Sequence, residues 1–456
     1  MVRIHTLNIE PPVVNASCAW ASDYEQLRDL YDSPYTGATI TRTATFNGFS
    51  EDASNTVALA QSSISSINSY GYSPHPLSKY LDWIYTILTT PMLDGSPPTK
   101  PMIISITAST PTVLAEMVEN IQTLRKKLRA SYSASVMGDF PPSSSGGAGR
   151  SSPFASSSTH APATFFPGVD PATLVAIELN TSCPNIKDAP PPSYNFQFLL
   201  PYLDVLSSAF YADPTLTIGL KLPPYLYQTR FTEAIRYLHT YTREVRSASF
   251  VKGSGSRHHH GTHPPEHVMR SLNPFAYLAC TNTLGNCLLF AEDTVPSPFS
   301  GALDSEETPP DDDMDTDQPA FLPPHQHQSS HRHPSPFRPS PSPPSPTASS
   351  SSTPPPHPPS PSFAPSPFAL PTPLGGLGGE ALHALALGNV YSFARLLAVH
   401  PDAAMRRIRI VGVGGVTSAA AAARMRQAGA SVVACATLLG REGVRAFEIV
   451  AGHAEP

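Results

Sequence analysis

The sequence has little charge, few cysteines and no long hydrophobic run. Only 14% of its 456 residues are charged, and the net charge of −6 lacks the basic excess that nucleic-acid binding requires. The five cysteines show no paired spacing, which argues against a disulfide framework. No run of about 18 apolar residues predicts a membrane helix, and the N-terminal residues lack the pattern of a signal peptide. We therefore expect a soluble, cytoplasmic protein with reduced thiols and neither nucleic acid nor membrane as a partner.

Proline, by contrast, is abundant and is concentrated in one tract. The chain has 53 prolines, and Pro and Ser make up 26 of the 40 residues from 331 to 370. These residues supply little packing volume, so the sequence predicts a long Pro/Ser-rich disordered insertion at 291–372. A Ser/Gly/Pro stretch at 136–170 and a His/Gly stretch at 252–265 predict two further low-complexity insertions.

Eight short apolar runs recur along the chain and predict eight strands. They are continuous rather than alternating, as expected for parallel strands that are buried on both faces. The runs cover 13–17, 38–42, 102–106, 175–179, 217–221, 277–281, 408–412 and 431–435. Stretches with helical periodicity lie between most of them, at 24–31, 77–88, 111–132, 196–210, 229–245, 389–399 and 418–427. This alternation predicts an α/β fold, a single (β/α)8 TIM barrel over 1–456 with long insertions in its loops.

The active site of such a barrel lies at the carboxyl ends of its strands. The residues at those ends are amides, hydroxyls, a thiol and two cations, and we expect them to converge. The insertion at 291–372 follows the sixth predicted strand and so leaves from this face. Those at 136–170 and 252–265 run from a helix into the next strand, which places them on the opposite face.

Two glycine-bearing loops close the seventh and eighth predicted strands, at 410–416 and 434–440. Backbone N–H groups without side-chain obstruction can surround a phosphate there. The alternative is a pair of tight turns that need glycine for the backbone alone. The position favours a phosphate-bearing cofactor, because barrels commonly hold phosphate after these strands.

Cys183 and Lys221 are the candidate reactive groups. Cys183 lies just beyond a strand, in ELNTSCPN (178–185), where a partly exposed thiol can abstract a proton. A lone cysteine beside a strand is otherwise inert packing. Lys221 ends another strand, where its charge could stabilise an anion that develops on a flavin ring, or could form a structural ion pair.

Several blocks of the sequence resemble one family, in the same order and at matching places in the barrel. They are NASCAWASDYEQLRDL, GATITRTAT, SINSYGYSPHPLSKYLDWI, ELNTSCPN, GLKLPPY, CTNTLGN, GGLGGEALHALALGNV and IVGVGGV. The chain is similar here to the soluble, fumarate-using (class 1) dihydroorotate dehydrogenases. The resemblance implies a homodimer with bound FMN that oxidises dihydroorotate to orotate in pyrimidine biosynthesis, with fumarate as the electron acceptor.

The resemblance also implies roles for individual residues, with Cys183 as the catalytic base. The residues implied to bind substrate are Arg42, Asn68, Gly71, Asn180, Asn185, Asn282 and Thr283. Those implied to bind the cofactor are Ser17, Arg42, Thr43, Asn180, Lys221, Gly379, Gly414, Gly415, Ala436 and Thr437.

The chain departs from the family pattern at several positions. Arg42 replaces a lysine, while Cys18 and Ala436 each replace a glycine, and the loop 185–194 lacks the usual Gly-Lys-Pro-Gln pattern. Arginine is bulkier and planar, so the change at position 42 is not conservative. Two alternatives therefore stay open: a related flavin oxidoreductase for another cyclic amide or enone, and a catalytically silent barrel whose insertion is an interaction scaffold.

Four histidines, at 258–260 and 263, could suggest a metal site. The Gly and Ser residues around them predict low complexity without the supporting hydrogen bonds that metal ligands have. We expect no metal.

Overall fold

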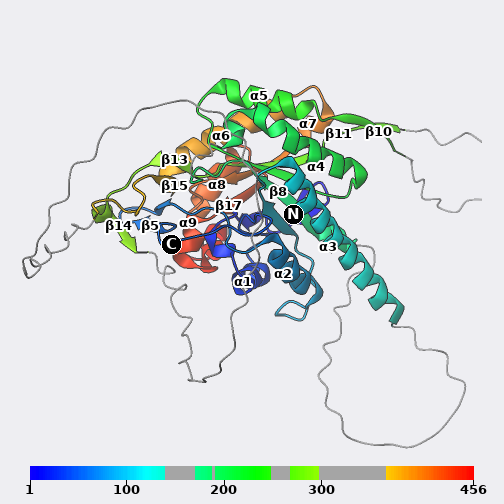
Figure 1. Cartoon of the computed structure of the whole chain (residues 1–456), viewed down its shortest axis with the longest axis horizontal. Coiled ribbons are helices and arrows are strands. Elements are labelled where there is room, and N and C mark those ends of the chain that lie inside the picture. Colours follow the sequence, from blue (N-terminus) through cyan, green and yellow to red (C-terminus); the bar gives the residue numbers. More distant parts are fainter. Residues whose placement is uncertain (139–169, 187–190, 248–267, 297–365, 456) are drawn as a thin grey trace, which may run out of the picture. The chain divides into compact units, whose positions relative to one another are not determined.

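Eight parallel strands form a barrel in the computed structural model. Two of them, β8 and β17, are labelled in Figure 1. The structure describes residues 1–138, 170–186, 191–247, 268–296 and 366–455. The sheet runs in the order β3-β17-β16-β12-β9-β8-β7-β4, and a parallel bridge between Val14 and Ala38 joins its two ends. The strands are β3 (Val13–Asn15), β4 (Thr39–Ile40), β7 (Met102–Ile106), β8 (Val175–Asn180), β9 (Ile218–Leu222), β12 (Phe275–Cys280), β16 (Arg409–Val413) and β17 (Val432–Cys435). Each overlaps a predicted run, and the (β/α)8 barrel is confirmed.

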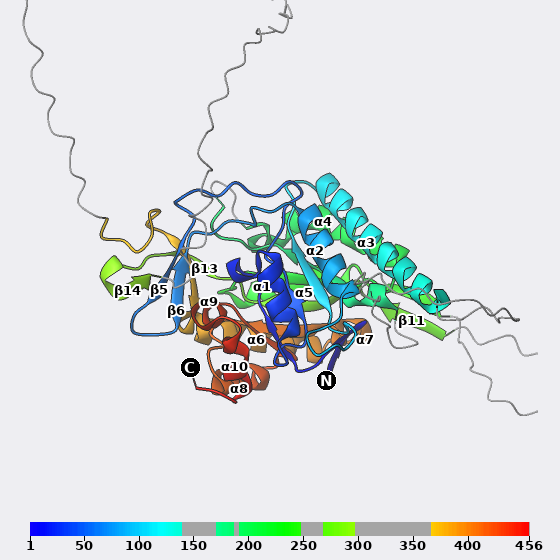
Figure 2. The same cartoon turned by 90° about the horizontal axis from the view of Figure 1, so that it is seen from below.

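Helices lie around the strands (Figure 2), and all but the last two connect one barrel strand to the next along the chain. They are α1 (Tyr24–Asp32), α2 (Leu77–Thr89), α3 (Pro111–Gly138), α4 (Leu200–Ala212), α5 (Gln228–His239), α6 (Glu380–Ala398), α7 (Ala403–Arg406), α8 (Ala419–Gln427), α9 (Thr437–Glu442) and α10 (Arg445–Ala451). Short 3-10 helices are η1 (Ala19–Ala21), η2 (Pro171–Leu174), η3 (Pro192–Tyr194), η4 (Phe196–Leu199) and η5 (Ala291–Asp293).

Several predicted helices have different bounds in the structure; the one predicted at 111–132, for example, extends to Gly138. The helix predicted at 229–245 ends at His239, because the following residues turn and then pair as β10 (Arg243–Ser247) with β11 (Val268–Leu272). This ladder depends on a partner distant in sequence, which local periodicity does not report. The helix predicted at 389–399 begins earlier, at Glu380, since Gly379 ends β15 and adopts a φ of 76° there.

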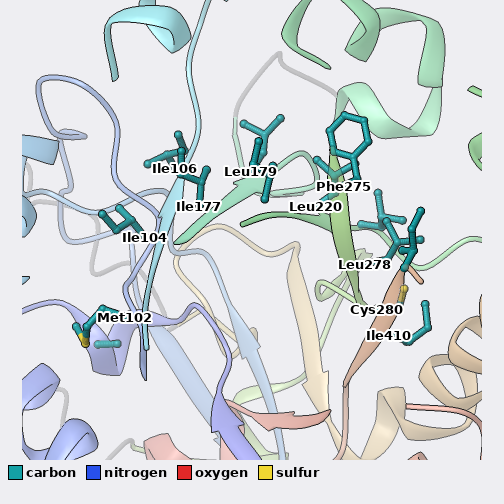
Figure 3. Close-up of a cluster of buried hydrophobic side chains, with 14 of the residues drawn as sticks. Met102, Ile104, Ile106, Ile177, Leu179, Leu220, Phe275, Leu278, Cys280 and Ile410 are labelled. Atoms are coloured by element: carbon teal, nitrogen blue, oxygen red, sulfur yellow. The ribbon is translucent and has the colours of Figure 1, made fainter. Parts of the chain in front are cut away.

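The barrel strands bury both faces, and alternate residues point to opposite sides. On β7, Met102, Ile104 and Ile106 pack in the layer between strands and helices (Figure 3), whereas Ile103 packs inside the barrel. This two-sided burial is why the strand sequences are continuously apolar. The inner cluster also contains Ile4, from the N-terminal hairpin of β1 (Val2–Ile4) and β2 (Leu7–Ile9). The hairpin thus packs against the barrel interior.

A second sheet, of five antiparallel strands, lies beside the site described below. Its order is β13-β15-β6-β5-β14. The strands are β5 (Val57–Ala60), β6 (Ser65–Asn68), β13 (Leu284–Cys287), β14 (Thr294–Pro296) and β15 (Gly375–Gly379).

This sheet corrects the predicted bounds of the insertion at 291–372. Residues 291–296 form η5 and β14, and β14 pairs with β5. At the other end, the Ala369 N–H donates to the Leu289 carbonyl at 2.9 Å. The composition missed these contacts because each partner lies far away in sequence. The remainder of this tract, from 297 to 365, and most of the predicted insertions at 136–170 and 252–265 lie outside the described residues.

Arg125 of α3 joins the helix layer to the barrel. Its fully buried guanidinium donates from Nη1 to the carbonyls of Ala172 and Val175, at 2.5 and 2.6 Å. Nη2 donates to Asp213 Oδ2 at 3.2 Å and to Thr215 Oγ1 at 2.8 Å. One side chain therefore satisfies acceptors on three segments.

We expect Arg125→Met to lower the free energy of unfolding by about 3 kcal/mol, because it leaves buried acceptors and a carboxylate without their partner. Lys126→Met is the matched control, since Lys126 is exposed on the same helix. Urea denaturation of both variants gives the comparison. Equal stabilities of the two variants would contradict the assigned role of Arg125.

Candidate active site

A cavity lies where the carboxyl ends of the barrel strands meet. It gathers residues from strand ends that are far apart in sequence. Every residue predicted for the site lines it: Ser17, Arg42, Thr43, Asn68, Gly71, Asn180, Cys183, Asn185, Lys221, Asn282, Thr283, Gly379, Gly414, Gly415, Ala436 and Thr437. The structure thus brings the predicted set together, while the role of each residue stays a prediction.

Sequence reasoning assigned no role to several other lining residues. They include Ser66, Tyr70, Thr281, Leu382, Thr417 and Leu438. The signal for Thr281 was present, because it directly follows β12 and precedes Asn282. Tyr70 lies in a loop beyond β6, and its sequence context gave no such signal.

The amide side chains hold one another across the cavity wall. Asn185 Nδ2 donates to Asn68 Oδ1 at 2.9 Å, which links the loop after β8 to the end of β6. Asn180 Nδ2 donates to Thr43 Oγ1 at 2.9 Å, and Asn282 Nδ2 lies 3.4 Å from Asn180 Oδ1. These bonds fix the orientation of the amides, so the wall presents preorganised donors and acceptors to a planar polar ligand.

Lys221 brings a positive charge to the same wall and is only 5% exposed. Its Nζ donates to the Ser17 carbonyl at 3.0 Å. Glu178, on the neighbouring strand β8, is 1% exposed and accepts a hydrogen bond from the Tyr277 hydroxyl at 3.2 Å. Burial raises the pKa of Glu178, and the nearby Lys221 ammonium opposes this shift. The ammonium of Lys221 is thereby held among strand ends rather than in a flexible loop.

Cys183 is partly exposed and borders two cavities. One is the cavity above, and the second is lined by aromatic side chains that include Phe46, Tyr72 and Tyr202. Burial of the sulfur raises the pKa of Cys183 above its usual value, against smaller opposing effects of a backbone hydrogen bond and the nearby cations. The thiol form therefore prevails at neutral pH. Residues 187–190, in the loop that follows, lie outside the described residues.

Glycines shape the opposite end of the cavity. Gly415 has a φ of 65°, and a Cβ added there would lie 2.5 Å from His383 Cβ. Gly379 has a φ of 76°, and an added Cβ would lie 2.2 Å from the Ile64 carbonyl oxygen. Both positions therefore require glycine. The Gly414–Gly415 backbone thus borders the cavity without side-chain obstruction.

Arg42, the main departure from the family pattern, makes an ion pair with Glu51. The guanidinium also lies over the Tyr70 ring, 5.2 Å from its centroid. Cys18, the second departure, lines the cavity as well, and burial raises the pKa of its thiol to about 11. The third, Ala436, lies beside Thr437, whose hydroxyl is 2.9 Å from Ser66 Oγ.

Two further findings concern the described part of the chain only. None of its helices is long and apolar enough to cross a membrane. Within the same residues, no three histidine, cysteine or carboxylate side chains are grouped so that they could hold a metal ion. The histidines at 258–260 and 263 lie outside the described residues.

Known proteins resemble this chain in the way that the motifs predicted. Residues 366–453 match the dihydroorotate dehydrogenase family. The chain is 22% identical over 275 residues to the "Putative dihydroorotate dehydrogenase A (fumarate)" of Streptococcus agalactiae serotype Ia, an alignment that covers 60% of this chain and 52% of the relative. It is also 22% identical over 272 residues to the "Probable dihydroorotate dehydrogenase A (fumarate)" of Streptococcus pneumoniae serotype 4, with 59% and 50% covered.

The chain therefore spans about half the length of the curated relatives that it matches. The matched family, the closed barrel and the order of the sequence blocks agree. The predicted resemblance is confirmed as a similarity: residues 366–453 match the dihydroorotate dehydrogenase family, and relatives that carry this name are 22% identical to the chain.

Proposed function

We propose that this protein is an FMN-dependent oxidoreductase that converts dihydroorotate to orotate in pyrimidine biosynthesis, with fumarate as the electron acceptor. One observation carries the proposal. The thiol of Cys183, the amides of Asn68, Asn180 and Asn282, and the ammonium of Lys221 line one cavity at the carboxyl face of the barrel. An acid–base group, amide donors and a fixed cation are what the oxidation of a planar cyclic amide requires.

The cavity residues fit a flavin nucleotide. The Gly414–Gly415 backbone would hold the phosphate, and Lys221 would lie where negative charge develops on the ring. The Thr281 hydroxyl is buried and has no hydrogen-bond partner within the described residues, so a bound group can supply one. The chemistry that FMN supplies when bound is the acceptance of a hydride.

The chain's own residues would perform the remaining work. The amide groups would orient the ring, and the Cys183 thiolate would take a proton from C5 as a hydride leaves C6. The substrate thereby loses one proton and one hydride and gains a carbon–carbon double bond. Fumarate would then receive the two electrons, together with two protons, and become succinate.

The family resemblance also supports a homodimer in the cytoplasm. We propose this assembly and location on that resemblance alone. Sedimentation velocity of the purified protein would test the assembly, and a single species at the mass of one chain would contradict it.

The visible spectrum of the purified protein tests the proposed function directly. We expect a yellow protein with about one FMN per chain, whose flavin absorbance is bleached by dihydroorotate without oxygen and restored by fumarate. Bleaching by another saturated cyclic amide, or reoxidation of the reduced flavin by an enone, without bleaching by dihydroorotate, would instead support the related oxidoreductase, which the Arg42–Glu51 pair favours. If the protein is colourless and stays colourless when FMN is added, both oxidoreductase functions are contradicted. The catalytically silent scaffold would then remain.

A further inference from the structure

The cavity wall carries two charged side chains among its described lining residues, Arg42 and Lys221, and none of these residues is a carboxylate. Lys221 donates one of its three N–H groups to the Ser17 carbonyl at 3.0 Å, and the proposed function assigns its charge to the flavin ring. Arg42 is then the remaining cation that can attract an anionic group on a bound substrate ring. The positive charge of Arg42, however, is compensated by a carboxylate that is not among the lining residues.

Glu51 supplies that compensation. Its carboxylate accepts from both terminal nitrogens of Arg42, with Nη1 and Oε2 3.3 Å apart and a second, shorter contact between Nη2 and Oε1. The side chains of the pair are 8% and 14% exposed. Such a two-point pair, largely withdrawn from water, is stronger and less screened than a surface ion pair.

Other contacts hold the guanidinium in this place. Arg42 Nη1 lies 3.4 Å from Ser22 Oγ, and the guanidinium carbon lies 5.2 Å from the centroid of the Tyr70 ring. The loop that carries Glu51 is itself anchored, because the Phe49 N–H donates to the Ser73 carbonyl at 2.8 Å. The pair is thus fixed from both the strand and the loop.

We propose that Glu51 is a specificity-determining residue that competes with the substrate for Arg42. An anionic ring must either share the guanidinium with this carboxylate or displace it, whereas an uncharged ring of the same size meets no such competition. Glu51 therefore lowers the affinity of the site for ring carboxylates relative to uncharged cyclic imides. The inference rests on the proposed function, since it assumes that the cavity binds such rings.

Calorimetric binding of orotate and uracil to the FMN-loaded protein tests the inference without turnover. Orotate carries a carboxylate at pH 7 and uracil does not. We expect Glu51→Gln, which keeps the shape and removes the charge, to raise the orotate affinity about tenfold and to leave the uracil affinity unchanged. Added salt should weaken orotate binding more in the variant than in the wild type. Asp52→Asn is the matched control, because it removes an exposed carboxylate from the adjacent position and should change neither affinity.

An orotate affinity that Glu51→Gln leaves unchanged or lowers would overturn the inference, as would equal gains for both ligands. If Glu51→Gln does not fold, the wild type provides a second test. It should bind orotate no more than about tenfold tighter than it binds uracil. A larger preference for orotate would overturn the inference. If dihydroorotate bleaches the flavin normally, the proposed function stands even where the binding results overturn the inference about Glu51. If neither orotate nor uracil binds the wild type or any variant, the inference and the proposed function are both overturned.

Discussion

Cys183→Ser is expected to slow flavin reduction by dihydroorotate about a thousandfold at neutral pH while FMN and substrate still bind. A serine hydroxyl keeps the shape of the side chain but ionises several pH units above a thiol. It therefore provides almost no base in the working range. Anaerobic stopped-flow absorbance measures the flavin reduction in a single turnover.

The pH dependence of the wild type provides an independent check. The proposed base is the Cys183 thiolate, and burial raises the pKa of this cysteine above its usual value. Below that pKa, the thiolate fraction rises about tenfold for each pH unit, so the reduction rate should rise with the same slope from about pH 6 to about pH 8. In Cys183→Ser the rate should stay about a thousandfold below the wild-type rate across this whole range.

Cys287→Ser is the control for these measurements, because Cys287 is half-buried and is not among the lining residues of the cavity. It should retain both the wild-type rate and its pH slope. A normal rate in Cys183→Ser would remove Cys183 from the role of base.

Gly415→Ala is expected to weaken FMN binding about a hundredfold and to yield a folded, colourless protein. The added Cβ would lie 2.5 Å from His383 Cβ and 2.9 Å from the Gly379 carbonyl oxygen, at a φ of 65° that alanine rarely adopts. The loop would have to shift, and its N–H groups would then no longer surround the phosphate that we propose to bind there. Fluorescence titration with FMN, together with circular dichroism, separates lost binding from lost folding.

Gly388→Ala provides the matched substitution. A Cβ added at Gly388 meets nothing within 4 Å, and the residue lies within α6. This variant should bind FMN normally and be slightly more stable, since alanine is favoured over glycine in a helix. If Gly415→Ala retained FMN as well as Gly388→Ala does, the phosphate site would have to lie elsewhere.

Much of the barrel and its candidate site could be predicted because both depend on local features. A parallel strand that is buried on both faces is apolar at every position, so its signal lies within about five consecutive residues. The carboxyl ends of such strands meet at one face, so the residues that follow them, such as Asn180, Lys221 and Asn282, could be grouped from their positions along the chain. The family blocks extended this reasoning to Gly71 and Gly379, which lie outside the barrel strands.

Tertiary structure alone decided the features that depend on partners distant in sequence. The pairing of β14 with β5 joins residues more than 200 positions apart and brought 294–296 into a sheet, although composition placed them in an insertion. The partner of Arg42 was equally hidden: the sequence showed an arginine where the family has lysine, but not that Glu51 would turn back from the next loop to meet it. Periodicity reports only which side of a segment is buried. Which groups meet across the fold depends on how loops pack over the barrel, where hydrogen bonds and charge pairing select the partner.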